Sequence, residues 1–507
     1  MLDLGRSFLA SVERNPGATA IVDSDCRLTY EQWFSRIQSV AAGLTGLGLA
    51  RGDHLVVILQ NRWEMATLHW ACQFSGVIMT PLNWRVKPDE IDYCAADAGA
   101  RVLVYQDVSA EAVAESTVAR GMKRITVGMD VPGDVPFESL LATPAPGMLM
   151  EATAEDWSLM LYTSGTTGKP KGVPRRHRHE RHAALAHVAQ NLYRYGERTL
   201  GVMPLYHTMG VRSLLAMALI DGRFVCVPRF DPAAVLESIG AEGITNLYLV
   251  PTLYHDVLAN PAAATAELGS VRKLGFAGAP MNEALVRKLV DRFQPELFVN
   301  HYGSSEVYTF TIDQRAADKP GSAGRAGINQ RIRVIKLDNF DASKLAAVGE
   351  EGQIIADMAS EESFEGYWNR PDADAKSIHN GWYFTGDTGY VDADGDLFVT
   401  GRVDDMMISG GENISPVEIE SLLSLHPAVD EVAVVGLPDE RWGQRVTAFI
   451  KRSAAVTPEQ LNEHCVTSGL ANFKRPRDYV FVREVPRSAV GKLLRRKLIA
   501  NEYEPET

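Results

Sequence analysis

The sequence predicts an α/β protein of two domains, a large one built on parallel sheet and a smaller α+β domain at the C-terminus. Much of the chain alternates short β-branched runs with helical patterns, which is the signature of βαβ units. The 507 residues exceed the roughly 250 to 300 at which one hydrophobic core usually stops growing. Beyond about residue 400 the elements shorten into a unit of about a hundred residues, a usual domain size.

A βαβ unit is readable around residues 231–250. Asp231 can cap a helix, Pro232 suits its first position, and "ITNLYLV" follows as a strand. A later apolar strand runs directly into "HYGSSE". Because ligands gather at the carboxyl ends of strands in open α/β sheets, residues 302–306 are a candidate site on topology alone.

Two capping-box patterns mark helices in the C-terminal unit. "SPVE" at 415–418 predicts a helix through about Leu425, and "TPEQ" at 457–460 repeats the pattern. Strands are expected at 431–437, 446–452 and 478–485 around these helices. Together they predict a compact α+β domain.

Composition restricts the class of protein. A net charge of -13 argues against a general nucleic-acid binder, since duplex affinity comes mainly from basic groups. The five cysteines are scattered and odd in number, as expected for reduced thiols in a cytoplasm, and the first residues lack the pattern of a signal peptide. Residues 65–84 carry no Asp, Glu, Lys or Arg, but polar residues and a proline interrupt them, which favours a buried α/β segment over a membrane span.

The stretch "YTSGTTGKPKG", residues 162–172, is typical of a loop that wraps an oxyanion. Its glycines allow close backbone approach, and its Ser and Thr hydroxyls can donate hydrogen bonds. A hydrolase P-loop needs four residues between its glycines and a Ser or Thr after the lysine. Here only two residues separate Gly165 from Gly168, and Pro170 follows Lys169, which disfavours a P-loop NTPase. On composition alone, a flexible linker is the other interpretation.

This loop resembles the signature of the adenylate-forming (ANL) superfamily of acyl- and aryl-CoA synthetases, luciferases and adenylation domains. Further superfamily blocks follow in order along nearly the whole chain: "MPLYHTMG", "FAGAPM", "HYGSSE", "GWYFTGDTGY", "GRVDDMMISGGENISPVEIE" and "PRSAVGKLLRRKL". The resemblance implies a large N-terminal domain of sheets and helices, residues 1–403, and a small mobile C-terminal domain, residues 404–507. It also implies a two-step reaction, in which a carboxylate attacks the α-phosphorus of ATP and a thiol then displaces AMP.

The resemblance implies that most of these blocks bind ATP. The loop would embrace the β and γ phosphates through Thr163, Ser164, Gly165, Thr166, Thr167, Gly168 and Lys171. Glu306 would help to hold Mg²⁺, Asp387 would accept the ribose hydroxyls, and Arg402 would face ribose and phosphate. The nucleotide-binding set is completed by Gly278, Ala279, Pro280, Tyr302, Gly303 and Ser305. Ser305 stands where the family usually has threonine.

Lys492 matches the family's adenylation lysine, whose ammonium stabilises charge that builds on the carboxylate and the α-phosphate. Ser488 replaces the usual threonine of that block. Because Lys492 must leave before a thiol can approach, the family rotates its small domain between the two steps. Asp404, in "GRVDD", occupies the hinge position.

Nine Lys and Arg residues gather between 473 and 497 and form a local basic patch within an acidic protein. Its "FKRPR" resembles the coenzyme A patch of aryl-CoA ligases. On that resemblance we assign coenzyme A to Phe473, Arg475, Arg477 and Trp442, with Gly410 and Gly411 along the pantetheine path. Core packing is the alternative for Trp442. The absence of a carrier-domain pattern favours free coenzyme A over a peptide-synthetase module, and luciferase-type oxidation shares the same motifs.

The acyl pocket is expected around His207, which is also a candidate catalytic residue and a rotating gate. The remaining predicted pocket residues are Met209, Gly210, Leu249, Gly278 and Ser304. No aspartate stands near this block to pair an amino-acid ammonium, and the blocks look most like those of chlorobenzoate and benzoate CoA ligases. We therefore expect an aromatic or cyclic carboxylic acid, with medium-chain fatty acids as the alternative. A catalytically inactive nucleotide-binding protein is the alternative from another class, and the oligomeric state stays open, with a homodimer as one candidate.

The segment 175–182, "RRHRHERH", is unusually basic for this position. Its "HERH" is one residue short of the HExxH spacing that places two histidines on one helical face. The sequence favours a solvated basic face near the phosphates over a metal site.

Overall fold

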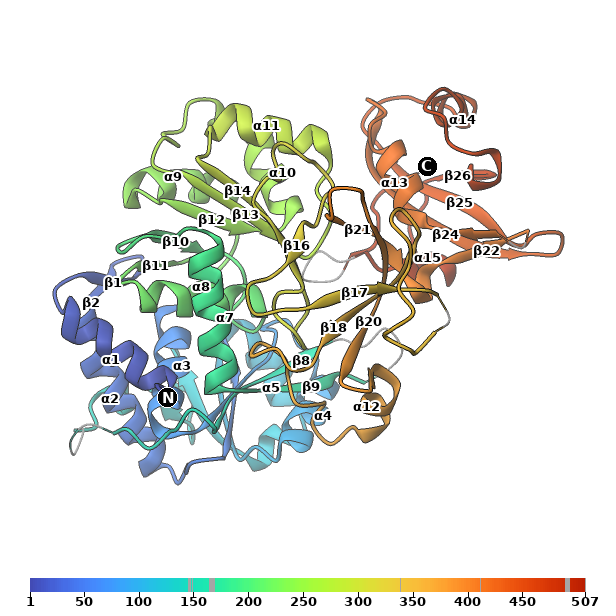
Figure 1. The fold of residues 1–507 in the computed structure, drawn as a ribbon. Coiled ribbons are helices and arrows are strands. Elements are labelled where there is room, and N and C mark those ends of the chain that lie inside the picture. Colours follow the sequence, from blue (N-terminus) through green and yellow to red (C-terminus); the bar gives the residue numbers. More distant parts are fainter. Residues whose placement is uncertain are drawn as a thin grey trace.

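The computed structural model describes residues 1–144, 147, 149–163, 169–337, 339–410, 412–487 and 493–506, and for Asp404 and Asn413 it describes the backbone alone. Within these residues the chain forms four sheets (Figure 1). Three lie before residue 403 and one after it, which confirms a large N-terminal part and a small C-terminal part. None of the helices among the described residues has the length and apolar character needed to span a membrane.

The first large sheet is mainly parallel, with an antiparallel strand at one end. Its seven described strands are, in sheet order, β7 (Val135–Pro136), β6 (Lys123–Val127), β5 (Val102–Gln106), β3 (His54–Ile58), β4 (Ile78–Pro81), β8 (Trp157–Thr163) and β9 (Lys171–Arg176). Buried helix α3 (Trp63–Ser75) leads into β4, so the prediction of a buried α/β segment at 65–84 is confirmed.

The second large sheet is parallel at its centre and antiparallel at its ends. Its nine described strands are, in sheet order, β16 (Arg325–Ala326), β15 (Thr311–Asp313), β14 (Leu297–Tyr302), β13 (Lys273–Ala277), β12 (Asn246–Leu249), β10 (Arg198–Gly201), β11 (Arg223–Cys226), β1 (Thr19–Asp23) and β2 (Cys26–Thr29). Helix α9 (Pro232–Glu242) starts where the sequence predicts it, because the Asp231 side chain accepts a hydrogen bond from the N–H of Ala234.

The largest hydrophobic core lies between these two sheets. It joins Leu55 and Leu159 of the first sheet to Ile21 and Phe224 of the second. Helices fill the same layer, and Figure 1 shows two of them between the sheets. The helices that contribute to this core are α1 (Leu4–Arg14), α2 (Tyr30–Gly46), α3, α6 (Phe137–Leu141), α7 (His177–Gln190) and α8 (Thr208–Leu219).

The remaining N-terminal helices cover the outer faces of the two sheets. A second core lies between the nine-stranded sheet and α9, α10 (Pro251–Ala259) and α11 (Glu283–Phe293). A smaller core on the other sheet includes residues of α4 (Pro88–Ala98) and α5 (Ala110–Glu115). Short 3-10 turns complete this part: η1 (Asp107–Ser109), η2 (Ala119–Gly121) and η3 (Pro261–Ala264).

A five-stranded antiparallel sheet follows the two large sheets in the sequence. Its strands are β17 (Ile332–Ile335), β18 (Gly352–Asp357), β19 (Ile378–His379), β20 (Trp382–Val391) and β21 (Leu397–Arg402), with helix α12 (Pro371–Ser377) before β19. Turn η4 (Val403–Asp405) leads from β21 into the C-terminal part.

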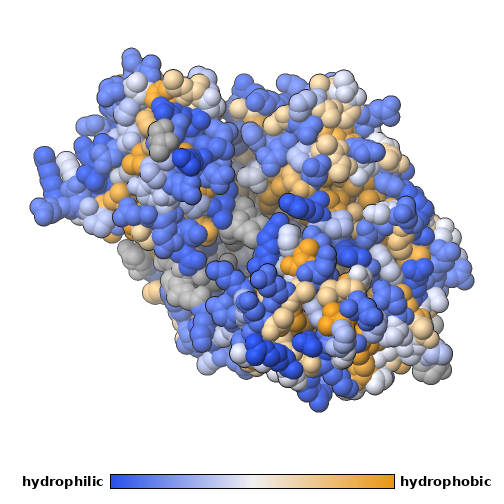
Figure 2. All heavy atoms as spheres, turned by 180° about the vertical axis from the view of Figure 1, so that it is seen from behind, coloured by the Kyte–Doolittle hydropathy of each residue, from blue (hydrophilic) through white to orange (hydrophobic). Residues whose placement is uncertain are grey.

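The C-terminal part has its own sheet and core. Its elements are β22 (Met407–Ser409), β23 (Glu412–Ile414), α13 (Pro416–Leu423), β24 (Val429–Asp439), β25 (Gly443–Arg452), α14 (Pro458–Thr467), η5 (Asn472–Lys474), β26 (Asp478–Phe481) and α15 (Arg495–Ile499). Figure 2 shows this part from behind as a lobe beside the larger body, with a mostly hydrophilic surface.

The capping prediction is confirmed at one helix and wrong at the other. Thr457 and Gln460 form a reciprocal capping box at α14. Ser415 makes no side-chain cap at α13, because its hydroxyl donates to the carbonyl oxygen of Thr400 in β21. This hydrogen bond links the C-terminal lobe to the sheet that precedes it.

Candidate active site

The predicted phosphate loop joins two antiparallel strands. Thr163, the last residue of β8, pairs with Lys171, the first residue of β9, and its Oγ1 donates to the Lys171 carbonyl oxygen at 3.4 Å. Residues 164–168 lie outside the described part of the chain. The two described ends of the loop are therefore held by the β8–β9 ladder.

Lys171 and Glu306 meet at the same place, although 135 positions separate them in the sequence. The Lys171 Nζ lies 4.0 Å from the centre of the Tyr367 ring, and the Tyr367 hydroxyl donates to Glu306 Oε1 at 2.7 Å. Burial lowers the pKa of Lys171, and the charge of Glu306 opposes that shift. A buried carboxylate beside an ammonium suits a phosphate with its Mg²⁺, which usually takes one or two carboxylates together with phosphate oxygens and water.

Asp387 is held between an aromatic hydroxyl and a guanidinium. Tyr302 donates to Oδ2 at 2.5 Å, and the Nη1 of Arg402 lies 3.1 Å from Oδ1, because Asp387 and Arg402 are partners in the β20–β21 ladder. Burial and then Asp387 raise the pKa of Tyr302 well above its usual range, so the phenol stays protonated. Burial lowers the pKa of Arg402, but the charge of Asp387 together with those of neighbouring groups outweighs this, and the net shift is upward. The structure thus groups three of the predicted nucleotide residues.

The carboxyl ends of β13 and β14 bring two further predicted segments together. Ala277 pairs with His301, so residues 278–280 and 302–305 follow neighbouring strands. Gly278 has a φ of +84°, which favours glycine. A Cβ on Gly303 would lie 2.0 Å from the carbonyl oxygen of Tyr308, so only glycine fits this turn. The placement agrees with the prediction made from topology, while the adenine contacts stay predictions.

His207 stands directly before α8, and its Nδ1 lies 3.2 Å from Thr208 Oγ1. Met209, two residues further along the chain, is buried in a small apolar cluster with Met203, Tyr248, Val250 and Ala277. A Cβ on Gly210 would lie 2.2 Å from the Pro204 carbonyl oxygen, so this glycine allows α8 to approach the preceding segment.

The structure does not bring Leu249 to the other predicted pocket residues. Successive side chains of a strand point to opposite faces. Tyr248 and Val250 therefore face Met209, whereas Leu249 is fully buried in the core beneath α9 and α10. The prediction named a residue on the face of β12 that points away from Met209, and the neighbouring Tyr248 lies on the Met209 face. Ser304 lies in the turn after β14, where its N–H donates to the Val307 carbonyl oxygen at 3.0 Å.

Part of the predicted coenzyme A patch is assembled around Trp442. The Arg477 guanidinium lies 4.2 Å from the centre of the Trp442 ring, and the Gly410 N–H donates to the Trp442 carbonyl oxygen at 2.9 Å. Gly410 has a φ of +63°, and a Cβ there would lie 3.1 Å from the indole. Phe473 is 41% exposed on η5, and the Nε of Arg475 donates to the Leu470 carbonyl oxygen at 2.9 Å. Gly411 lies outside the described residues.

Residues 488–492, with Lys492 and Ser488, also lie outside the described residues. Arg487 and Leu493, on either side of them, form an antiparallel bridge. Arg495 binds Asp405 at 2.9 Å and Glu420 at 2.7 Å, so the segment after Lys492 is tied to the turn that holds Asp404. This role of Arg495 was not predicted, because the basic segment reads in the sequence as a single anion site.

Comparison with known proteins decides the family. The AMP-binding enzyme model matches residues 8–368, and the AMP-binding enzyme C-terminal domain model matches residues 418–492. The chain belongs to the AMP-binding enzymes. It is 35% identical over 510 aligned positions to a 4-chlorobenzoate–CoA ligase of an Arthrobacter species, covering 98% of this chain and 96% of that protein. It is 32% identical to a long-chain-fatty-acid–CoA ligase of Mycobacterium tuberculosis, covering 98% of both chains.

Solved structures of the same superfamily have the same fold. An anthranilate CoA ligase in complex with anthranoyl-AMP superposes with a TM-score of 0.91 at 27% identity, covering 99% of this chain and 97% of the other. An o-succinylbenzoate CoA synthetase of Bacillus subtilis with its acyl-adenylate gives 0.85 at 28% identity, covering 97% of each chain. The predicted fold class and superfamily are confirmed.

The histidine-rich segment of this AMP-binding enzyme is not the solvated face that the sequence predicted. His177 and His179 are buried at the start of α7, and the Nδ1 of His177 accepts from the N–H of Leu4. Arg175 is also fully buried, 2.8 Å from Glu180. The prediction was wrong because α7 lies in the layer between the two large sheets, where few of its faces reach water.

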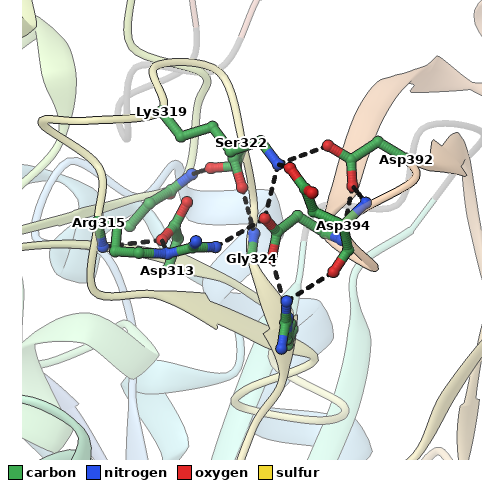
Figure 3. A network of polar contacts seen from close by, with 10 residues as sticks. Asp313, Arg315, Lys319, Ser322, Gly324, Asp392 and Asp394 are labelled. Carbon is green, nitrogen blue, oxygen red and sulfur yellow. Dashed lines mark hydrogen bonds and ion pairs between the residues drawn. The ribbon is translucent and has the colours of Figure 1, made fainter.

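A second group of charged residues lies on the surface, at the hairpin between β20 and β21. The aspartates 392, 394 and 396 form the one group among the described residues whose ligand atoms are close enough to hold a metal ion. The Lys319 ammonium lies among them, at 2.5, 3.0 and 2.7 Å, so an internal cation already neutralises the group (Figure 3). Arg315 and Arg325 bind Asp396 at 2.6 and 3.1 Å. We call these six residues the surface ion network. Because its carboxylates are paired with basic side chains of the same chain, we interpret it as a structural link between these segments.

Proposed function

We propose that this chain is an ATP- and Mg²⁺-dependent carboxylate:CoA ligase that acts through an acyl-adenylate on an aromatic or cyclic acid. The observation that carries the proposal is the grouping of Lys171 with Glu306 and of Tyr302 with Asp387 and Arg402, which lie in or follow strands of three different sheets. The family supplies the reaction class, and relatives named as chlorobenzoate and anthranilate CoA ligases support the acid class. The long-chain-fatty-acid relative supports the alternative, a fatty acid.

In the proposed adenylation step, the chain orients a carboxylate oxygen toward the α-phosphorus of ATP. Lys492 stabilises the charge that develops there, and Lys171 with the loop at 163–168 receives the departing pyrophosphate. Glu306 holds Mg²⁺, which when bound neutralises phosphate charge. Asp387 and Arg402 fix the ribose, and the AMP leaving group stays bound while the thiol attacks. An electrostatic contact made at the developing charge is commonly worth about 10²- to 10³-fold in rate.

The test is pyrophosphate release with ATP and Mg²⁺ on benzoate, 4-chlorobenzoate, cyclohexanecarboxylate, octanoate and phenylalanine, each with and without coenzyme A. We expect CoA-stimulated turnover on the ring acids. Lys492→Ala should lower the adenylation rate at least about 100-fold. Lys497→Ala, in the same basic segment, is the matched control and should retain the rate. Turnover on octanoate alone would mean that the substrate is a fatty acid and not an aromatic or cyclic acid. ATP binding without pyrophosphate release would favour an inactive nucleotide-binding protein.

We also propose that the C-terminal domain, residues 404–507, rotates at Asp404 between the two half-reactions. Support comes from the short turn η4, which joins β21 to the C-terminal lobe. Proline at position 404 restricts one backbone torsion. Asp404→Pro should slow thioester formation and spare acyl-adenylate formation, whereas Asp404→Ala leaves the backbone free and should affect neither. Single-turnover assays of each half-reaction separate the two steps, and equal loss of both would contradict the hinge.

The assembly and location of the enzyme are part of the proposal. Cys26, Cys72, Cys94, Cys226 and Cys465 are all free thiols, which supports a reducing cytoplasm. A homodimer is expected to give twice the mass of 55.6 kDa by light scattering. A mass near that of one chain would exclude it.

A further inference from the structure

A group of buried polar side chains lies beside the apolar cluster around Met209, where the acyl pocket is proposed. They come from α7, α8, β12, β14 and the loop after β18, and we call them the inner polar cluster: His187, Asn191, Arg212, Tyr248, His301 and Glu362. Each of the six is at most 3% exposed. Segments that are distant in the sequence thus bring hydrogen-bonding groups together beside the proposed acyl pocket.

Tyr248 connects this cluster to the apolar residues next to His207. It packs with Met203, Met209, Val250 and Ala277 on one side. Its ring centre also lies 4.9 Å from those of both His187 and His301. Burial raises the pKa of its hydroxyl, and the nearby charge of Arg212 opposes that shift. Arg212 follows Met209 by three positions on α8, so it lies about one helical turn further along the same face.

The hydrogen bonds of Asn191 assign the proton positions on both imidazoles. Its Nδ2 donates to the His187 carbonyl oxygen at 2.8 Å, which fixes the orientation of the amide. The same Nδ2 lies 3.1 Å from His187 Nδ1, which must accept, and Oδ1 lies 3.1 Å from His301 Nε2, which must donate. Burial lowers the pKa of both histidines well below the usual range, so each ring is neutral. His187 therefore carries its proton on Nε2, and His301 keeps a free lone pair on Nδ1.

Four buried atoms of this cluster have no hydrogen-bond partner among the described residues. Two are donors, His187 Nε2 and Arg212 Nε, and two are acceptors, His301 Nδ1 and Glu362 Oε2. The other carboxylate oxygen of Glu362 accepts from Asn329 at 3.2 Å. A buried polar atom left unpaired is unfavourable, so four in one cluster call for a group that both donates and accepts.

We propose that this cluster selects, among aromatic carboxylic acids, those that carry a hydroxyl or amino substituent at the end of the ring far from the carboxylate. The inference rests on the proposed ligase function and names its substrate class. A hydroxyl or amino group can donate to at least one open acceptor and accept from an open donor, whereas a chloro or unsubstituted ring would leave all four atoms unpaired. A site built to hydrogen-bond a substrate group rejects the analogue that lacks it far more strongly than an apolar pocket rejects a missing methylene.

The experiment compares kcat/KM for pyrophosphate release on 4-hydroxybenzoate, 3-hydroxybenzoate and 4-aminobenzoate with that on benzoate and 4-chlorobenzoate. We expect the best polar acid to exceed both others by at least about 10-fold. His187→Phe removes one open donor and leaves no buried charge, and it should reduce this ratio to near 1. Arg212→Met is the second variant, with the same expected direction.

His54→Phe is the matched control, because His54 is also buried with an unpartnered Nε2 but lies on β3, in the other large sheet. It should leave the ratio unchanged, and thermal melting verifies that each variant is folded. Calorimetric titration of the same acids measures their affinities without turnover. If no acid releases pyrophosphate, the proposed function fails, and the affinity ratio still tests the inference. Equal preference for apolar acids, or a preference that survives both variants, overturns it and leaves ordered water as the occupant of the cluster.

Discussion

Two networks of charged side chains in this enzyme have similar chemistry and opposite states of pairing. In the surface ion network, Asp396 is fully buried but binds Lys319, Arg315 and Arg325, whose side chains are 24%, 51% and 62% exposed. In the inner polar cluster, Arg212 and Glu362 are almost completely buried and each leaves one polar atom without a partner among the described residues. This difference shows that a group of closely spaced charged side chains does not by itself identify a ligand-binding site. A network whose members satisfy one another holds structure, and one that stays open inside the protein is suited to a ligand.

The largest expected effect concerns the Arg175–Glu180 ion pair, which is paired like the surface ion network and buried like the inner polar cluster. Arg175 is fully buried against Glu180, and its Nη1 also donates to the carbonyl oxygens of Glu306 and Glu362 at 3.1 and 2.7 Å. Arg175→Met leaves the Glu180 carboxylate buried without its guanidinium. We expect a loss of about 3 to 5 kcal/mol in the free energy of unfolding, measured by urea denaturation.

The double variant Arg175→Met/Glu180→Leu is the control for this prediction. It removes both charges, and buried ion pairs replaced by apolar residues are often neutral in stability. Most of the lost free energy should therefore return. If the double variant is as unstable as the single one, the cost lies in the lost carbonyl contacts and not in the unpaired carboxylate.

The parts of the candidate site that can be predicted from the sequence lie in short contiguous blocks. The loop at 162–172, Asp387 and Glu306 can be found this way because each block carries its own residue order. The α9 start at Asp231 could be predicted for the same reason, since a cap depends on neighbours within three residues. Fold class follows from the alternation of strand and helix patterns along the chain.

The rest depends on contacts between distant segments. The error at Leu249 is a shift of one residue along β12, which the sequence cannot fix when both faces of a strand are buried. Ser415 has a local cap pattern, but Thr400 of a neighbouring strand takes its hydrogen bond. The inner polar cluster joins residues from 187 to 362, and no local pattern connects them. Buried charged residues on α7 were misread because helix exposure depends on the sheets on either side.

The smallest expected effect tests the surface side of the comparison. In Asp396→Ala the basic partners can be solvated by water, so the free energy of unfolding should fall by only roughly 1 kcal/mol. The rate of adenylation should not change. Because these pairs are partly exposed, high salt should shrink the loss, whereas Arg175→Met should respond little to salt. Burial raises the pKa of Asp396, but the hydrogen bonds from Lys319, Arg315 and Arg325 outweigh this and lower it to about 2.

The direction of that shift fixes the pH dependence. Since the carboxyl binds its proton less readily in the folded state, its contribution is complete above its unfolded pKa of about 4 and is lost as pH falls toward 2. The difference in unfolding free energy between the wild type and Asp396→Asn should therefore decrease from pH 5 to pH 2. A difference that stays constant over this range would mean that Asp396 stabilises the folded state through packing and not through its charge.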